Sequence, residues 1–454
     1  MTKNVDDAPG GGDGSDGGET NVAPSGESPP ASLWRNAEFL RFWGGETLSL
    51  YGIQITALAL PLTAVLVFQA SPGELGMLRF VQMVPYLGLA LLFGVWVDRS
   101  KKRPMMLGAN ISRMVLIGLV PVFSMTGLLN LPVLYVLALG IGIASVLFDV
   151  SWMSYVPSIV RDRRSLLDAN AKLSTTSSSA EVVGPGIAGL LVSSLSAPTA
   201  MAVNAVSYAV SVVSLFSIRA PEPVSASVEK RRLRTDLAEG LRWVFGNRYL
   251  RAIALVGSSC NFFMIMVSSL FLLYAVQNAG LSPSGVGFIL GAGSVGGLIG
   301  AVVSGPIVRR FAVGRIYAVS VAVIFLGPLL IPAARGPKPV LWGLFIASFF
   351  IAYMGVSVAN VVIVSLRQAI TPDPLMGRMS AATRMLMFGG GALGGPVGGL
   401  VADQVGLHSA LWVAAGASAV MLVPIALSPV TRLKSLPAKA AAASQVEASL
   451  AVPN

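Results

Sequence analysis

The residues of this sequence that could do chemistry are charged side chains inside long apolar stretches. Charges in such surroundings cost free energy, so each is a functional candidate by default. The candidates are Glu46, Asp149, Glu181 and Arg113. A carboxyl group at a partly dry site can bind and release a proton near neutral pH, so these positions indicate proton transfer or the binding of a cation. The alternative for Asp149 is a fixed salt bridge or a helix–helix hydrogen bond, with Arg113 as its partner.

Histidine and cysteine are too scarce to support most enzymatic chemistry. The chain contains one of each, Cys260 and His408, so the sequence predicts no intramolecular disulfide and no histidine-rich metal centre. It also lacks a GxxxxGK[ST] loop, the phosphate-binding loop of many ATP-driven pumps. We therefore expect no metal, no cofactor and no enzymatic activity, and carboxyl groups are the obvious proton carriers.

The elements that must position these charges are membrane helices. Of the 454 residues, 54% are hydrophobic and 12% are charged, and the mean hydropathy of +0.73 is too high for a water-soluble globule. An apolar helix of about 20 residues crosses a bilayer, and the sequence predicts twelve such spans. Their approximate bounds are 39–68, 74–97, 104–127, 132–157, 170–195, 199–218, 251–278, 285–308, 314–333, 339–366, 379–403 and 407–428.

Lysine and arginine are distributed unevenly over the predicted loops. If both termini are cytoplasmic, the inner loops contain 20 of the 32 Lys and Arg residues, and the outer loops contain Arg335 and Lys338 alone. Cytoplasmic loops of membrane proteins are enriched in these residues. The pattern therefore predicts a multi-pass protein of the cell membrane with both ends in the cytoplasm. It also accounts for the net charge of +11 without a nucleic-acid partner.

The chain repeats itself at an offset of 211 residues. The shift superposes Ser71-Pro72 on Ser282-Pro283, Gly76 on Gly287, Gly94 on Gly305 and Gly184-Pro185 on Gly395-Pro396. Parallel repeats of this kind bind substrate between their two halves, near the middle of the membrane. We expect an all-α membrane protein with two pseudo-symmetric six-helix bundles, 33–218 and 251–430.

The segments outside the two bundles are expected to be cytoplasmic. Residues 1–32 contain seven glycines and six acidic residues without an apolar run, which is typical of a disordered tail, and we expect a second such tail at 431–454. The connector 219–250 has apolar residues at helical spacing beside basic ones. These are Leu233, Leu237, Leu241 and Val244. They predict an amphipathic helix at the inner membrane surface. The alternatives are a solvated linker and a nucleic-acid or import signal.

The predicted loop between spans two and three reads Gly94-Val-Trp-Val-Asp98-Arg99-Ser-Lys-Lys102-Arg103-Pro104. It resembles the loop signature of the major facilitator superfamily, G-x-x-x-D-R-x-x-R/K-R/K. The resemblance implies that Gly94 lets helices approach closely. It also implies that Asp98 pairs with cations or a helix N-terminus across the two halves, so that Asp98, Arg99 and Arg103 form a gating latch. Without the family, the basic residues would indicate a cytoplasmic loop and no more.

A glycine–proline element occurs in spans five and eleven, and it resembles the element associated with exporters of this superfamily. Its residues are Gly184, Pro185 and Gly189, and Gly395, Pro396 and Gly399. Glycines allow helices to touch, and proline bends a helix because it lacks a backbone donor. We expect these residues at a pliable seam between helices, with simple close packing as the alternative.

The resemblance extends over residues 33 to about 430. The opening Trp34-Arg-Asn36-Ala-Glu-Phe39-Leu-Arg41-Phe-Trp43 and the segment Arg378-Met-Ser-Ala-Ala-Thr383-Arg384 are similar to the branch with macrolide-efflux and enterobactin-exporter-like proteins. Many proton-driven drug antiporters of the superfamily have an arginine in span four, but 138–145 contains no basic residue. Proton coupling would therefore use other groups. Arg384 is expected to anchor an interhelical network.

The family resemblance implies that spans one, four, seven and ten line the central cavity, which would place Glu46 and Asp149 there. Further cavity candidates are Tyr51, Gln54, Trp152, Asn261, Phe262, Tyr353 and Asn360. We expect an apolar pocket with few directional groups, suited to an amphipathic organic molecule such as a drug, antibiotic or siderophore.

We therefore expect a monomeric secondary transporter that exports such a molecule by alternating access, in exchange for protons. An importer or uniporter of the same fold is the first alternative. A non-transporting receptor would normally need a large soluble domain to relay a signal, and a membrane enzyme lacks the histidines and cysteines that it would use.

Overall fold

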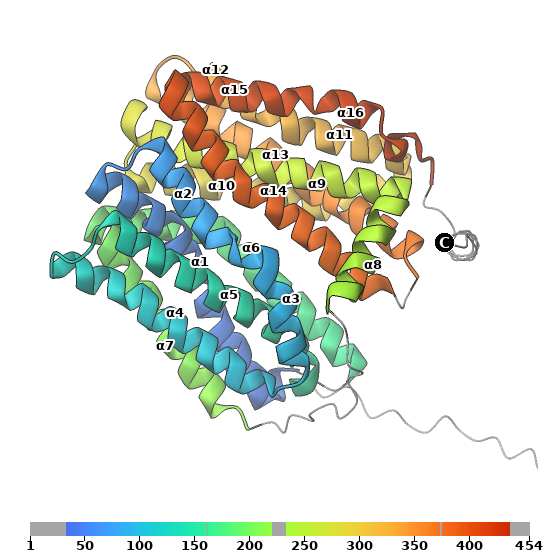
Figure 1. The fold of residues 1–454 in the computed structure, drawn as a ribbon, viewed down its shortest axis with the longest axis horizontal. Coiled ribbons are helices and arrows are strands. Elements are labelled where there is room, and N and C mark those ends of the chain that lie inside the picture. Colours follow the sequence, from blue (N-terminus) through green and yellow to red (C-terminus); the bar gives the residue numbers. More distant parts are fainter. Residues whose placement is uncertain (1–32, 161, 220–232, 373–374, 436–454) are drawn as a thin grey trace, which may run out of the picture.

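The computed structural model describes residues 33–160, 162–219, 233–372 and 375–435. The predicted tail 1–32, residues 220–232 of the predicted connector and residues 436–454 lie outside the described residues. The described chain is helical and contains no strand within those ranges. Figure 1 shows two groups of helices that lie against each other, one from blue to green and one from green to red.

The first half consists of seven helices. They are α1 (Ala37–Phe68), α2 (Pro72–Met83), α3 (Pro85–Asp98), α4 (Lys102–Met125), α5 (Leu131–Ile159), α6 (Arg163–Leu195) and α7 (Ala197–Ser217). The starts of several helices are set by local sequence. Ser71 and Ser282, which the internal repeat aligns, each accept a hydrogen bond from a backbone N–H three residues on and are each followed by proline. Both residue types favour the first positions of a helix.

The second half begins with the connector helix. Its elements are α8 (Leu233–Gly246), α9 (Arg248–Leu273), α10 (Pro283–Arg310), α11 (Val313–Leu326), α12 (Leu330–Ala333), α13 (Lys338–Ile370), α14 (Met376–Val405), α15 (Leu407–Val420) and α16 (Leu422–Ala426). A π-helical turn, Tyr274–Asn278, continues α9, and a 3-10 turn, Gly327–Leu329, joins α11 to α12.

The twelve-span prediction is confirmed, with one correction to the second span. Eleven helical segments among the described residues are long and apolar enough to cross a membrane. The twelfth crossing, predicted as one span over 74–97, is divided into α2 and α3 at Val84. Pro85 is the reason, because proline has no N–H to donate and its ring clashes with the preceding turn.

Helices α2 and α14, and helices α6 and α10, form the main contacts between the halves. Within the first half, α1 packs on α6 and α7, and α4 packs on α5 and α7; within the second, α9 packs on α14 and α10 on α13. We call the α2–α14 and α6–α10 contacts the two seams. We call the end of the bundle near α8 the α8 end and the opposite end, where α2 and α10 begin, the far end (Figure 1).

The α2–α14 seam is a contact between backbones. A Cβ atom on Gly76 would collide with the carbonyl oxygen of Gly395 and lie 3.1 Å from the Cα atom of Pro396. One turn further along α14, a Cβ atom on Gly399 would lie 2.7 Å from the Cα atom of Gly73. Larger side chains would push the helices apart, so glycine is required at these positions.

The α6–α10 seam has the same character and lies at the same end. A Cβ atom on Gly287 would collide with the carbonyl oxygen of Pro185, and one on Gly189 would lie 2.6 Å from the carbonyl oxygen of Pro283. The backbone N–H of Ser284 donates a hydrogen bond of 2.9 Å to Ser193 Oγ across the seam. Both seams lie in the far part of their helices, so the halves are closed against each other at the far end.

The α6–α10 seam predicts that alanine substitutions of two glycines on α6 will affect stability differently. Gly189→Ala would add a methyl group 2.6 Å from the Pro283 carbonyl oxygen, and such overpacking costs about 1–3 kcal/mol. Gly186→Ala is the matched control, since its methyl group would meet nothing within 4 Å and alanine favours a helix by up to about 1 kcal/mol. We expect the first variant alone to lower the melting temperature of the purified protein. Equal melting temperatures would contradict the close contact.

Candidate functional site

A cavity of about 570 Å³ lies between the two halves and is the candidate substrate site. Helices α1, α2 and α6 of the first half and α9, α10 and α13 of the second half form its walls. Along α10, the lining residues Leu290, Ser294 and Ala301 follow the seam residue Gly287 toward the α8 end. The cavity therefore lies on the α8 side of the α6–α10 seam.

The lining is more polar than the apolar pocket that we expect from the sequence. Its polar side chains are Gln54, Arg79, Ser178, Glu181, Ser268, Ser294, Tyr353, Ser357 and Asn360. The apolar part includes Leu58, Phe271, Leu272 and Leu290. Such a mixture provides many directional groups beside apolar surface.

Four of the cavity candidates and proton-coupling candidates named from the sequence line this cavity: Gln54, Glu181, Tyr353 and Asn360. Pro185, expected at a seam, lines it as well. The structure also shows one lining charge that was not singled out from the sequence, Arg79 on α2. The signal was present, because Arg79 is a charged residue inside a predicted span and such residues are functional candidates by default.

The other cavity candidates lie outside the lining. Tyr51 Oη and Ser179 Oγ are 2.8 Å apart and join α1 to α6. Asn261 Nδ2 donates a hydrogen bond of 3.0 Å to the Gly257 carbonyl oxygen of its own helix. Phe262 packs edge-on against its neighbour Phe263. The Trp152 Nε1 atom is buried and has no hydrogen-bond partner among the described residues.

A second group of charged residues lies within the first half, around Arg113 of α4. The Arg113 side chain is 1% exposed, and its guanidinium carbon lies 4.1 Å from the ring centre of Phe148 and 4.8 Å from that of Tyr208. Its Nη1 atom donates a hydrogen bond of 3.4 Å to Tyr208 Oη. Arg113 Nε and Nη2 are buried without a hydrogen-bond partner in the described part of the chain. Stacking on two rings thus takes the place of an ion pair.

Glu46 and Asp149 lie within electrostatic range of Arg113 but differ in exposure. Glu46 is 5% exposed, whereas the Asp149 side chain is not enclosed by other side chains. Tyr86 Oη donates a hydrogen bond of 2.9 Å to Asp149 Oδ2. Among the described residues no ion pair joins Arg113 to Asp149. The hydrogen bond from Tyr86 of α3 is of the helix–helix kind that the alternative for Asp149 includes.

Tyr86 connects this group to the second half of the molecule. Its ring stacks on that of Phe388 of α14, with ring centres 4.8 Å apart and planes at 25°. Arg384 lies one turn earlier on α14, within electrostatic range of Asp149 and Arg367. The carboxylate of Asp149 is therefore joined through Tyr86 to a contact between the two halves.

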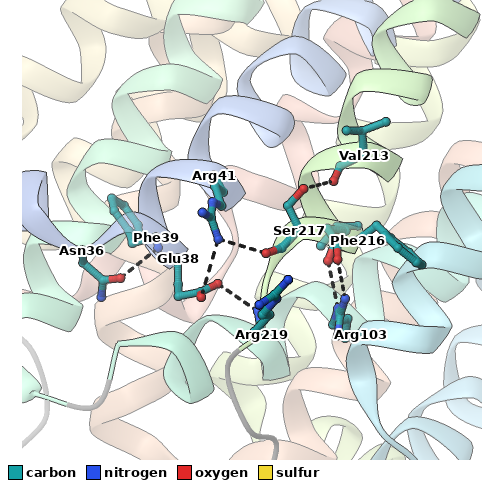
Figure 2. Close-up of polar contacts among 10 residues, drawn as sticks. Asn36, Glu38, Phe39, Arg41, Arg103, Val213, Phe216, Ser217 and Arg219 are labelled. Carbon is teal, nitrogen blue, oxygen red and sulfur yellow. Dashed lines mark hydrogen bonds and ion pairs between the residues drawn. The ribbon is translucent and has the colours of Figure 1, made fainter.

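Arg103 of the predicted gating loop contacts the C-terminal end of α7 in the first half. Figure 2 shows Arg103 at the C-terminal end of α7, where Nε and Nη2 donate hydrogen bonds of 2.8 and 2.7 Å to the carbonyl oxygens of Leu215 and Phe216. Arg41 Nη1 of α1 donates a hydrogen bond of 2.9 Å to the next carbonyl, that of Ser217. The last carbonyls of a helix lack the usual partner four residues on, and the Leu215 carbonyl also accepts a bond of 3.3 Å from the Ile218 N–H. The two arginines complete the hydrogen bonding at the end of α7.

For the other residues of the loop, the latch stays a prediction. A Cβ atom on Gly94 would meet nothing within 4 Å, so the close helix approach expected there is absent. Arg99 is exposed at the end of α3. The side chain of Asp98 lies outside the described residues.

The glycine–proline residues differ in what they touch. Pro185, Gly189, Gly395, Pro396 and Gly399 lie at the two seams. Gly184 instead faces α1, where a Cβ atom would lie 2.6 Å from that of Gln54.

The connector helix α8 packs on protein rather than facing a membrane surface. Leu237, Leu241 and Val244 join an apolar cluster with residues of α9 and α14. Arg378 of α14 makes ion pairs of 2.8 Å with Asp236 and 2.6 Å with Glu239 of α8. The apolar face of α8 is therefore covered by the second half, and the position of α8 at the inner membrane surface stays a prediction.

Comparison with known proteins identifies the family. The chain matches the profile described as Major Facilitator Superfamily twice, over residues 42–337 and 254–451. The chain belongs to the major facilitator superfamily. It is a multi-pass membrane transporter and not an enzyme, as the sequence predicts.

Relatives and solved structures agree with this assignment. The chain is 28% identical to the multidrug efflux pump Tap of Mycolicibacterium fortuitum, over 79% of this chain and 87% of that protein. It is 22% identical to macrolide efflux protein A of Streptococcus pyogenes, over 88% and 98%. Among solved structures it shares its fold with a mutant of the nucleoside transporter NupG, with a TM-score of 0.72 and 12% identity over 86% of this chain and 100% of that chain.

The contacts of Arg103 predict a loss of stability on substitution. Arg103→Ala removes two charge-assisted hydrogen bonds from the end of α7, which we expect to cost about 1–2 kcal/mol and to lower the melting temperature of the purified protein. Arg103→Lys should recover part of the loss, and Arg99→Ala is the exposed control from the same loop. An unchanged melting temperature with a loss of transport would instead support a latch.

Proposed function

We propose that this transporter exports small organic molecules from the cell by alternating access and uses the proton gradient as its energy source. The observation that carries this proposal is the cavity whose walls come from both halves and which is closed off at the far end by the two seams. A site between two repeats that rock against each other is how transporters of this kind give alternating access. We also propose that the protein functions as a monomer.

The charge distribution supports a cytoplasmic position for the α8 end. The loops at this end include those predicted to be inner and contain most of the lysine and arginine residues, whereas Arg335 and Lys338 lie at the far end. Positive residues are retained on the cytoplasmic side. With this orientation both termini are cytoplasmic and the far-end seams close the cavity to the outside.

Two observations favour export over import. The relatives reported above are named for efflux. The glycine–proline residues of α6 and α14 other than Gly184 lie where the two halves meet, as expected for an exporter-type seam. The polar and apolar lining suits an amphipathic organic molecule.

The proton-coupling part of the proposal rests on Asp149. Tyr86 donates a hydrogen bond to it while stacking on Phe388 of the opposite half. Loss of the negative charge would weaken that charge-assisted hydrogen bond. Proton binding would thereby release Tyr86 and alter a contact between the halves. Glu46, buried near Arg113, is the second proton-carrier candidate.

Substitution of Asp149 tests the coupling. Asp149→Asn should abolish proton-linked export and leave protein levels unchanged, because the amide cannot bind and release a proton. The measurement is substrate efflux from proteoliposomes with an imposed pH difference. Asp168→Asn, an exposed carboxylate at the α8 end of α6, is the matched control. Unchanged efflux by the Asp149 variant would remove Asp149 from the coupling mechanism.

Labelling of single cysteines tests the orientation. In a Cys260→Ser background, we expect Arg335→Cys at the far end to react with a membrane-impermeant maleimide in intact cells. Arg310→Cys at the α8 end should react only after the cells are permeabilised. The reverse pattern would contradict a cytoplasmic α8 end, and with it the assignment of the far end as the closed outer side.

A further inference from the structure

We propose that Arg79 and Glu181 form a charge-selecting pair in the cavity, so that the site prefers a zwitterionic ligand with one anionic and one cationic group. Arg79 would bind the anionic group and Glu181 the cationic group. This inference rests on the proposed function in one respect, because it takes the cavity between the halves as the substrate site.

Arg79 is the anion-binding side of the pair. It lies on α2 and lines the cavity. Its Nη2 atom donates a long hydrogen bond of 3.4 Å to the Ala57 carbonyl oxygen of α1, and it makes no ion pair with any residue that the structure describes. A guanidinium has five N–H donors in a planar fork that fits a carboxylate. Most of the donors of Arg79 are therefore available to a ligand.

Glu181 provides the opposite charge on another helix. It lies on α6, lines the same cavity and is exposed within it. No ion pair joins Glu181 to Arg79 or to any other residue in the described ranges. The lining residues Gln54, Ala57 and Leu58 of α1 belong to the same wall, and α1 contacts both α2 and α6. The two charges thus lie on helices that flank α1, and they do not neutralise each other directly.

Tyr353 of α13 faces both charges from the second half of the molecule. It lines the cavity and lies within electrostatic range of Arg79 and of Glu181. Asn360 and Ser357 of the same helix add hydrogen-bonding groups. A ligand held between Arg79 and Glu181 would therefore contact both halves, which a substrate must do if it is to bias their relative movement.

The physical reason for a zwitterionic preference is that charges away from bulk water need partners. A ligand with one charge would pair with one of the two side chains and leave the other without a partner. A ligand with both charges pairs with each, and the complex is neutral. Charge-assisted hydrogen bonds of this kind are about twice as strong as neutral ones. We therefore expect the site to bind a zwitterionic ligand about tenfold more tightly than a ligand with one charge.

Two dyes of nearly equal size test this preference. The probes are diaminorhodamine free acid, an aromatic zwitterion, and its methyl ester, a cation without the carboxylate. Binding to the purified protein in detergent is followed by fluorescence polarisation. Wild-type protein should bind the free acid about tenfold more tightly than the ester. Arg79→Gln should remove this difference by weakening the free acid alone, and Arg79→Lys should retain most of it.

Matched variants separate charge recognition from misfolding. Glu181→Gln should weaken both dyes, because both carry the cationic ring system, and Arg335→Gln in the far-end loop should leave both affinities unchanged. Equal affinities of wild-type protein for the two dyes, including no binding of either, would overturn the inference. Equal weakening of both dyes by Arg79→Gln would overturn it as well. Binding in detergent needs no gradient, so a failure of export with the expected binding pattern would contradict the proposed function alone.

Discussion

The close approach of backbones at the two seams is the constraint on which the rest of this structure depends. Gly76 and Gly287, which the internal repeat aligns, meet Gly395-Pro396 and Pro185 of the opposite half. Because no side chain separates these helices, the two halves are held together at the far end. The cavity lies on the α8 side of the α6–α10 contact and takes its walls from both halves.

The charged side chains within the membrane helices lie in two different environments. Arg113 is enclosed by the rings of Phe148 and Tyr208 inside the first half, where stacking replaces an ion pair. Arg79 and Glu181 instead line the space between the halves. The buried group is connected to the second half through Asp149, Tyr86 and the stacked ring of Phe388. In the proposed mechanism, proton binding in the first half and ligand binding between the halves act on the same movement.

The sequence predicts much of the fold and less of the site. The spans follow from hydropathy, because lipid admits only helices whose backbone groups are satisfied within the segment. The repeat offset of 211 residues aligns Gly76 with Gly287, and both lie at seams. The structure shows no close contact at Gly94, and the apolar face of α8 is covered by protein. Arg103 donates hydrogen bonds at the end of α7, a contact that the sequence did not predict, and its gating role stays a prediction.

The amino-acid sequence by itself determined that this is a membrane protein, that it has twelve crossings, and that glycines lie at the seams. Each of these depends on local composition or on spacing along one helix. The tertiary structure alone decided which charges meet the cavity. Arg79 reaches it, whereas Arg113 does not, because the direction of a side chain depends on how its helix is rotated against its neighbours. Hydropathy carries no information about this rotation. The rotation is set by packing between helices that are distant in sequence.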